Sequence, residues 1–195
     1  MPDKTKIAIF GGNFDPVHLG HVSLAEESQS SIGLDRIIFL PCLKSPHKAN
    51  VPSASPEQRL EILRIATEEH EWIDVSRWEI DGPSPSYSWM AAEHFKDKFP
   101  ETELFWIIGN DQWQKIETWA EPEKLAKILT FIVFPREDET PTLKANFRSV
   151  FIDYHHEASS TAIRKNLASN STSSSLLNPQ VKEFIDENRI YQSDN

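Results

Sequence analysis

Short apolar runs that alternate with helical segments are the feature that most constrains the fold of this chain. Such runs predict four strong strands, at residues 6–10, 36–42, 104–108 and 130–134. Two weaker strands are predicted at 72–80 and 149–152. Uniformly apolar strands are typical of parallel sheets buried on both faces. Because helices are predicted between the strands, the fold class is α/β, a doubly wound parallel sheet with helices on both faces.

The helical segments have recognisable starts. Ser55, followed by Pro56 and by Gln58 three residues after the serine, predicts a capping box. Other helices are predicted at 19–31, 87–99 and 159–167, and one more begins at Asn178. Residues 125–129 are predicted to end a further helix. Loops are predicted at 44–55, 82–86 and 169–175. No repeat or linker divides the chain. We therefore expect a single domain over residues 1–195, with a small C-terminal helical part at about 159–191.

Composition excludes several classes of protein. The chain has 195 residues, of which 38% are hydrophobic, and contains no apolar run near the ~18 residues that span a bilayer. Its first residues lack a secretory signal, which predicts a cytoplasmic protein. Cys42 is the only cysteine, so an intrachain disulfide and a cysteine-based zinc site are excluded.

The charge balance limits the partners. The net charge is -10, which repels nucleic acids and anionic membranes, so we expect neither as a partner. A phosphate-bearing ligand would need a locally basic pocket. Glycines and basic side chains do follow the predicted strands, at 11–21, 45–48, 109–111 and Arg136. In doubly wound sheets ligands bind beyond the carboxyl ends of the strands, which is where these residues fall.

The segment after the first strand has the features of a phosphate site. Gly11 and Gly12 allow a sharp turn and close approach of a ligand. His18 and His21 are three residues apart and share one face at a helix start, where free amides attract anions. Gly20 between them leaves space for a ligand. The alternatives are surface or core histidines or a zinc site, although the spacing of His47 and Cys42 does not favour zinc.

A second polar cluster lies near the C-terminus. Ser159, Ser160 and Thr161 at a helix start present hydroxyls and backbone N–H groups, and Arg164 falls within the first turns. Such a cluster suits a multiply charged phosphate chain. The alternative is an ordinary capped helix.

Both clusters resemble signatures of one superfamily. His-x-Gly-His after a Gly-x-Phe-Asp turn resembles the nucleotidyltransferases with a Rossmann-like fold, in which the two histidines contact ATP phosphates and stabilise charge in the transition state. Residues 159–164 resemble the Ser-Ser-Thr-x-Ile-Arg motif of nucleotide adenylyltransferases, which grips the β- and γ-phosphates. Cytidylyltransferases usually carry a different motif there.

Further segments resemble one subfamily, the bacterial nicotinate-nucleotide adenylyltransferases. Residues 45–48, with His47 and Lys48, resemble its Pro-His-Lys loop, unless they form a solvated basic loop. Residues 82–88 resemble its Gly-x-Ser-Tyr-Thr segment, which holds the pyridine nucleotide. Here Pro85 is an extra residue and Ser88 stands in place of threonine.

Three further features match that subfamily. Gly109 and Asp111 resemble its Gly-x-Asp, whose carboxylate suits ribose hydroxyls. Trp119 after a threonine resembles its pyridine-stacking tryptophan, with Trp113 as the rival candidate and core packing as the alternative for either. Arg136 matches an arginine near the acceptor phosphate.

The resemblance implies transfer of the adenylyl group of ATP to nicotinate mononucleotide, giving nicotinate adenine dinucleotide and pyrophosphate in NAD biosynthesis. Mg²⁺ would arrive with ATP, without protein metal ligands. Alternatives are nicotinamide mononucleotide or phosphopantetheine as acceptor, or a non-catalytic nucleotide-binding module. A homo-oligomer is compatible with the sequence.

The expected catalytic residues are His18, His21, Lys48 and Arg164. The expected ATP-binding residues are Gly11, Gly12, Phe14, His18, His21, Gly109, Asp111, Ser159, Ser160, Thr161 and Arg164. The expected mononucleotide-binding residues are Asn13, His47, Lys48, Tyr87, Ser88, Trp119 and Arg136.

Overall fold

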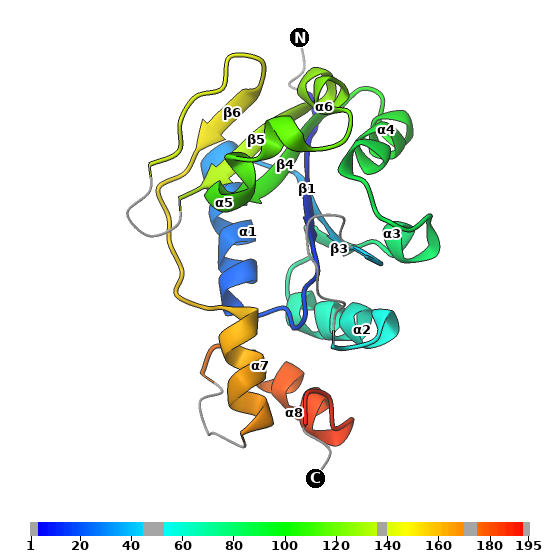
Figure 1. Cartoon of the computed structure of the whole chain (residues 1–195), viewed down its shortest axis with the longest axis vertical. Coiled ribbons are helices and arrows are strands. Elements are labelled where there is room, and N and C mark those ends of the chain that lie inside the picture. The colour runs from blue at the N-terminus through cyan, green and yellow to red at the C-terminus, as the bar shows by residue number, and fades with distance from the viewer. Residues whose placement is uncertain (1–3, 45–52, 136–139, 170–174, 193–195) are drawn as a thin grey trace.

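A computed structural model describes residues 4–44, 53–135, 140–169 and 175–192, and within them a six-stranded parallel sheet (Figure 1). The strand order is β3-β2-β1-β4-β5-β6, and every neighbouring pair is parallel. The strands are β1 (Lys6–Gly12), β2 (Arg36–Pro41), β3 (Ile73–Val75), β4 (Glu103–Gly109), β5 (Leu129–Phe134) and β6 (Arg148–Phe151). The α/β prediction and the four strong strand predictions are confirmed.

Helices follow the predicted segments closely. Ser55 Oγ accepts a hydrogen bond from the Gln58 backbone N–H at 3.1 Å, and Gln58 Oε1 accepts one from the Ser55 N–H at 2.8 Å, so the capping box is confirmed. The helices are α1 (Leu19–Ile32), α2 (Pro56–Thr67), α3 (Trp78–Asp81), α4 (Ser88–Lys98), α5 (Asn110–Trp113), the 3₁₀ helix η1 (Ile116–Thr118), α6 (Pro122–Ile128), α7 (Ser160–Ala168) and α8 (Pro179–Glu187).

The prediction of a strand over residues 72–80 is wrong for its second half. Only the three residues of β3 pair with β2, and the chain then forms the short helix α3. Ser76 makes the turn, because its hydroxyl accepts a hydrogen bond from the Trp78 N–H at 3.3 Å. Arg77 and Asp81 then form a two-bond ion pair one turn apart, at 2.7 and 2.9 Å. The apolar alternation of this segment resembles a strand, and these local polar bonds override it.

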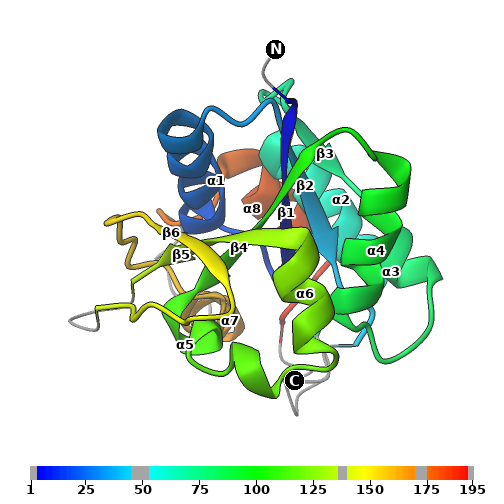
Figure 2. The same ribbon diagram turned by 90° about the horizontal axis from the view of Figure 1, so that it is seen from above.

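The sheet is buried on both faces, as its apolar strands require. Alternate residues of β1 point to opposite faces, so Ala8 and Phe10 belong to one buried cluster and Ile7 and Ile9 to the other. The first cluster is completed by α1, α2, α7 and α8, and the second by α4, α5, η1 and α6 (Figure 2). The sheet is therefore doubly wound, and both C-terminal helices share the core of the first face.

The topology fixes where a ligand can bind. From β1 the chain continues into α1 on one face, whereas from β4 it continues into α5 and α6 on the other. Neighbouring parallel strands whose connections diverge in this way leave a crevice at their carboxyl ends. In Figure 1 this is the lower end of the sheet, beside α7 and α8. No helix among the described residues is long and apolar enough to cross a membrane.

Candidate active site

A pocket of about 150 Å³ lies at the carboxyl ends of β1 and β4. An apolar cavity of roughly this volume holds one benzene molecule, so the pocket has the size of a single six-membered ring. It is lined by Phe10, Gly11, Gly12, Asn13, Cys42, Glu79, Ser86, Ser88, Trp106, Ile107, Ile108, Gly109, Gln112 and Trp119. The lining therefore combines two indole rings with backbone groups and a few polar side chains.

The glycine pair at the end of β1 is required by neighbouring rings. A Cβ atom on Gly11 would lie 2.7 Å from Cζ2 of Trp106, and one on Gly12 would lie 3.1 Å from the Phe14 ring. Phe14 itself is 2% exposed and packs against Phe10, so any contact with ATP at this residue falls to its backbone. The glycines thus let strand β1 end directly against the aromatic lining of the pocket.

The structure distinguishes the two candidate tryptophans. Trp113 is fully buried, donates its indole N–H to the Thr142 carbonyl at 2.9 Å and packs edge-on against Phe147. Trp119 begins just after η1 and lines the pocket. Both tryptophans belong to one buried cluster, but of the two only Trp119, which is 9% exposed, is among the described residues that line the pocket.

The two motif histidines form a stacked pair at the start of α1. His18 is the N-cap residue and His21 the third residue of the helix, with ring centroids 3.7 Å apart and planes at 28°. The His18 backbone N–H donates to Nδ1 of His21 at 3.3 Å. Because that nitrogen accepts, the ring proton of His21 resides on Nε2, which makes Nε2 a hydrogen-bond donor.

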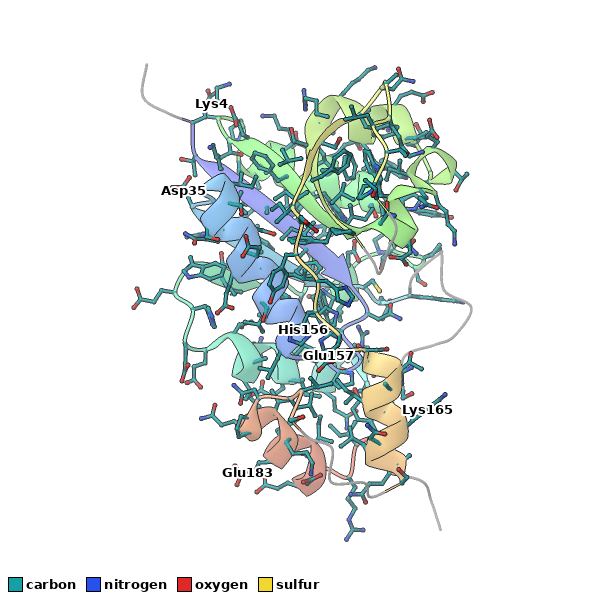
Figure 3. All side chains as sticks on the ribbon, turned by 90° about the vertical axis from the view of Figure 1, so that its left-hand side faces the viewer. Lys4, Asp35, His156, Glu157, Lys165 and Glu183 are labelled. Carbon is teal, nitrogen blue, oxygen red and sulfur yellow. The ribbon has the colours of Figure 1, made fainter. Side chains whose placement is uncertain are left out.

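Gly20 does not leave open space as the sequence suggests. A Cβ atom there would lie 2.9 Å from Nδ1 of His156, 3.1 Å from Nδ1 of His18 and 3.2 Å from Cβ of Ala158. The chain between β6 and α7 passes along α1 and fills this space, as the position of His156 in Figure 3 shows. Close packing of this segment is thus sufficient reason for a glycine here.

The two motifs meet, although about 145 residues separate them. Ser160 Oγ donates to the Pro16 carbonyl at 3.0 Å, across 144 residues of sequence. Arg164 donates to the Asp15 carbonyl at 2.6 Å, across 149 residues. In Figure 1, α7 accordingly begins beside the start of α1. The segments that carry the two motifs are therefore in direct contact.

The polar groups of α7 are arranged around this junction. Ser159 is the N-cap residue, although its hydroxyl makes no cap hydrogen bond within the described helix. Arg164 also donates to Thr161 Oγ1 at 3.4 Å, so the arginine is held on the same side as the threonine. Ser159 and Thr161 are exposed, which leaves this end of α7 accessible to a ligand.

Asp15 is the buried anchor of the junction. It is 4% exposed, and its carboxylate accepts from the backbone N–H groups of Ser53 and Ala54 at 2.8 and 3.0 Å. The Tyr191 hydroxyl donates to it at 2.8 Å, and burial raises the pKa of that tyrosine. The sequence suggests only a turn at Asp15, because the partners are supplied by distant segments.

Arg59 connects the ends of two strands and was not predicted as a site residue. The side chain is fully buried and donates to the carbonyls of Asn13 at 2.7 Å and Cys42 at 2.8 Å. Burial lowers the pKa of Arg59, and the negative charge of Asp15 opposes that shift. Arg59 of α2 therefore fixes the turns after β1 and β2 relative to each other, at the carboxyl ends of the two strands.

The other predicted residues are placed as follows. Asn13 lines the pocket and accepts a hydrogen bond from the Cys42 thiol at 2.9 Å. Ser88 and Gly109 also line it, Tyr87 is the N-cap residue of α4, and Asp111 lies in α5. Three predicted site residues lie outside the described residues: His47, Lys48 and Arg136.

Glu79 is a pocket residue that no sequence motif singles out. It lies on α3, is 5% exposed and lines the pocket. Burial raises the pKa of its carboxyl to about 7, and a hydrogen bond with the Ser86 side chain opposes the shift. No sequence signal could have found it, since its burial depends on the turn at Ser76.

The described residues contain no group of three or more His, Cys, Asp or Glu side chains able to hold a metal ion. Mg²⁺ needs six oxygen ligands and readily takes most of them from phosphates and water. This part of the chain is compatible with a Mg²⁺ ion bound by phosphates and water.

Known proteins resemble this chain in sequence and in fold. Residues 9–166 match the family model described as cytidylyltransferase-like, a range that includes both motifs. A protein of Methylacidiphilum infernorum named "probable nicotinate-nucleotide adenylyltransferase" is 38% identical over 187 residues, covering 95% of this chain and 92% of the relative. Nicotinate-nucleotide adenylyltransferase of Bacillus subtilis is 33% identical over 192 residues, covering 96% and 99%.

A solved structure supports the fold. Plasmodium falciparum nicotinic acid mononucleotide adenylyltransferase complexed with NaAD matches with a TM-score of 0.78 and 19% identity, covering 96% of this chain and 97% of the other. At that identity the likeness concerns the fold alone, which is the Rossmann-like doubly wound sheet expected from the sequence.

Proposed function

Because the chain belongs to the cytidylyltransferase-like family and its relatives of 33–38% identity are nicotinate-nucleotide adenylyltransferases, we propose that it transfers the adenylyl group of ATP to nicotinate mononucleotide. One observation of the geometry carries the proposal. The histidine pair and the start of α7 meet beside a pocket that has the size of one aromatic ring. A triphosphate and a pyridine ring would thus find complementary groups at adjacent places.

In the proposed reaction, a 5′-phosphate oxygen of nicotinate mononucleotide attacks the α-phosphorus of ATP in line. A bond forms between that oxygen and the α-phosphorus, the bond from the α-phosphorus to the bridging oxygen breaks, and pyrophosphate leaves. The second product is nicotinate adenine dinucleotide. Catalysis consists of positioning and of neutralising charge in the transition state, without a covalent intermediate.

For the ATP side, His18, His21 and Arg164 are the proposed catalytic residues, and Lys48, which lies outside the described residues, is the fourth. The Nε2–H of His21 would donate to a phosphate oxygen. Arg164 uses part of its guanidinium to hold the Asp15 carbonyl, and the five donors of that group leave others for phosphate. The hydroxyls and exposed amides of Ser159, Ser160 and Thr161 would bind the terminal phosphates, together with the backbone of residues 11–14.

For the acceptor side, Trp119 would stack on the pyridine ring, and Asn13, Tyr87 and Ser88 would bind around it. On the ATP side, Gly109 would lie close to the nucleotide and Asp111 would accept a hydrogen bond from a ribose hydroxyl. His47, Lys48 and Arg136 are proposed for the acceptor phosphate on the resemblance of their motifs alone. Mg²⁺ is proposed to come with ATP, and it would neutralise charge on the phosphates.

The substrates also suggest where the protein acts. ATP and pyridine mononucleotides are small metabolites of the cytoplasm, and we propose a cytoplasmic location. The net charge of -10 agrees with small-molecule substrates rather than a nucleic acid partner.

An acceptor assay tests the proposal. The full chain is incubated with MgATP and, separately, with nicotinate mononucleotide, nicotinamide mononucleotide and phosphopantetheine, and released pyrophosphate is measured with the nucleotide product. We expect the highest kcat/KM with nicotinate mononucleotide. Faster turnover of phosphopantetheine would assign another adenylyltransferase activity, and ATP binding without pyrophosphate from any acceptor would indicate a non-catalytic module.

A further inference from the structure

We propose that Glu79 determines how strongly the pocket prefers an acidic over a neutral pyridine ring, by presenting a neutral carboxyl in one state and a repelling carboxylate in the other. This inference rests on the proposed function, and it concerns the one feature of the acceptor that the motifs leave open. Nicotinate carries a negative charge that nicotinamide lacks, so a charge next to the ring distinguishes the two.

The position of Glu79 is held by Ser86, which is itself held by two hydrogen bonds. Its side chain lines the pocket together with Ser86, Ser88 and Trp119. Ser86 Oγ accepts from the Leu43 N–H at 3.2 Å, so its own hydroxyl proton is available to the Glu79 carboxyl, with which it forms a hydrogen bond. The Ser86 N–H in turn donates to the Lys44 carbonyl at 3.0 Å. The serine therefore ties the carboxyl to the end of β2 and holds it at the pocket wall.

No described positive charge compensates Glu79. Cys42 is the other titratable side chain among those that line the pocket. On the same helix, Arg77 is paired with Asp81 at 2.7 Å, and both are exposed. From α4, His94 stacks on Trp78, and burial lowers the pKa of that histidine, which favours its neutral form.

Helix α3 packs against β2, and Lys44, which follows that strand, is exposed. Helix α5 also contributes a side chain to the pocket. Gln112 of α5 lines the pocket and donates to the Asp111 carboxylate at 3.0 Å. Ionised Glu79 would thus face uncharged or acidic groups of the described residues. A further negative charge in the pocket would therefore repel the ionised carboxylate of Glu79.

The protonation state of Glu79 then changes within the working range of an enzyme. Burial raises the pKa of Glu79 to about 7. Below that pH the neutral carboxyl has an O–H that can donate to a nicotinate carboxylate, whereas above it two carboxylates share one site and repel. A neutral nicotinamide ring experiences much less of this change.

The ratio of kcat/KM for nicotinate mononucleotide to that for nicotinamide mononucleotide tests the inference. It is measured with the full chain and MgATP between pH 5.5 and 9, because groups that act equally on both acceptors cancel in the ratio. We expect the ratio to fall by at least about tenfold as pH rises, which corresponds to a modest like-charge repulsion. In Glu79→Gln, which keeps the shape and a hydrogen-bond acceptor, the ratio should not change with pH.

Two further variants make the outcome decisive. Asp81→Asn removes an exposed carboxylate from the same helix and should keep the wild-type profile. Ser86→Ala removes the hydrogen bond that favours ionised Glu79, so the midpoint of the ratio should move to higher pH; this holds even if Glu79→Gln fails to fold. A wild-type ratio independent of pH, an unmoved midpoint in Ser86→Ala, or a pH-dependent ratio in Glu79→Gln would overturn the inference. No pyrophosphate from either pyridine mononucleotide would overturn the proposed function as well.

Discussion

At the scale of single residues, the proposed phosphate site depends on imidazoles held by backbone groups. His18 occupies the N-cap of α1 and its N–H fixes the orientation of His21, so the two rings stack with 3.7 Å between centroids. A histidine held in this way needs no rearrangement to donate to a phosphate. On the proposed function, the histidine pair is therefore in place before ATP binds.

Replacing His18 by Asn separates its catalytic role from its structural one. Asn is a good N-cap residue, so helix α1 should keep its start, while the imidazole is lost. We expect kcat to fall by about 10²-fold or more, as when a transition-state donor is removed, with an unchanged circular dichroism spectrum. Near-normal kcat in a folded His18→Asn protein would remove this residue from the mechanism.

Glu79 also predicts a pH dependence of stability. Its pKa rises from 4.5 to about 7 on folding, so between these values the folded state holds a proton that the unfolded state has lost, and stability falls as pH rises. The loss is about 3 kcal/mol when complete. Glu79→Gln cannot ionise, so its free energy of unfolding relative to wild type should increase from pH 4.5 to pH 8. Urea titrations of both proteins measure this, and a difference that is constant with pH would refute the shift.

At the scale of elements, the sequence predicts the strands, most helices and the capping box of α2, because each depends on local periodicity or on neighbouring polar residues. It also predicts that α7 must approach α1, since two phosphate motifs imply one ligand. It fails where a side chain depends on distant segments. Arg59 and Asp15 are buried connectors only because the ends of strands contact Arg59 and Tyr191, near the C-terminus, contacts Asp15. Glu79 was missed because residues 72–80 turn into a helix after β3.

The C-terminal connection can be tested by removing one hydroxyl. Tyr191→Phe loses the 2.8 Å hydrogen bond to the Asp15 carboxylate and leaves a buried acceptor with one partner fewer. Hydrogen bonds to charged groups contribute about 1.5–3 kcal/mol, so the free energy of unfolding should decrease by that amount. Tyr154→Phe is the matched control, because the described contact of Tyr154 is its ring against Phe134, and it should change stability little.

At the scale of the whole molecule, the C-terminal helices belong to the same core as the sheet. Ile163 of α7 and both Val181 and Ile185 of α8 are buried in the cluster that contains Ala8 and Phe10. We propose that the chain folds as one domain, since a separate C-terminal unit would leave these residues without their partners. The sheet and the helix that carries Arg164 are then stabilised together.

Urea unfolding should accordingly show a single transition. Tryptophan fluorescence reports mainly on the face of the sheet that carries Trp106, Trp113 and Trp119, whereas far-ultraviolet circular dichroism also reports on α7 and α8. For one cooperative unit the two curves coincide. A circular dichroism change that precedes the fluorescence change would instead indicate that the C-terminal helices unfold on their own.

The central claim is that the histidine pair and α7 bind one triphosphate, and a crystal structure with Mg²⁺ and an ATP analogue that resists cleavage between the α- and β-phosphates tests it directly. We predict ring nitrogens of His18 and His21, hydroxyls at the start of α7 and the Arg164 guanidinium within hydrogen-bonding distance of the same triphosphate. A triphosphate bound elsewhere, or held by the histidines while α7 stays out of reach of every phosphate oxygen, would contradict the account.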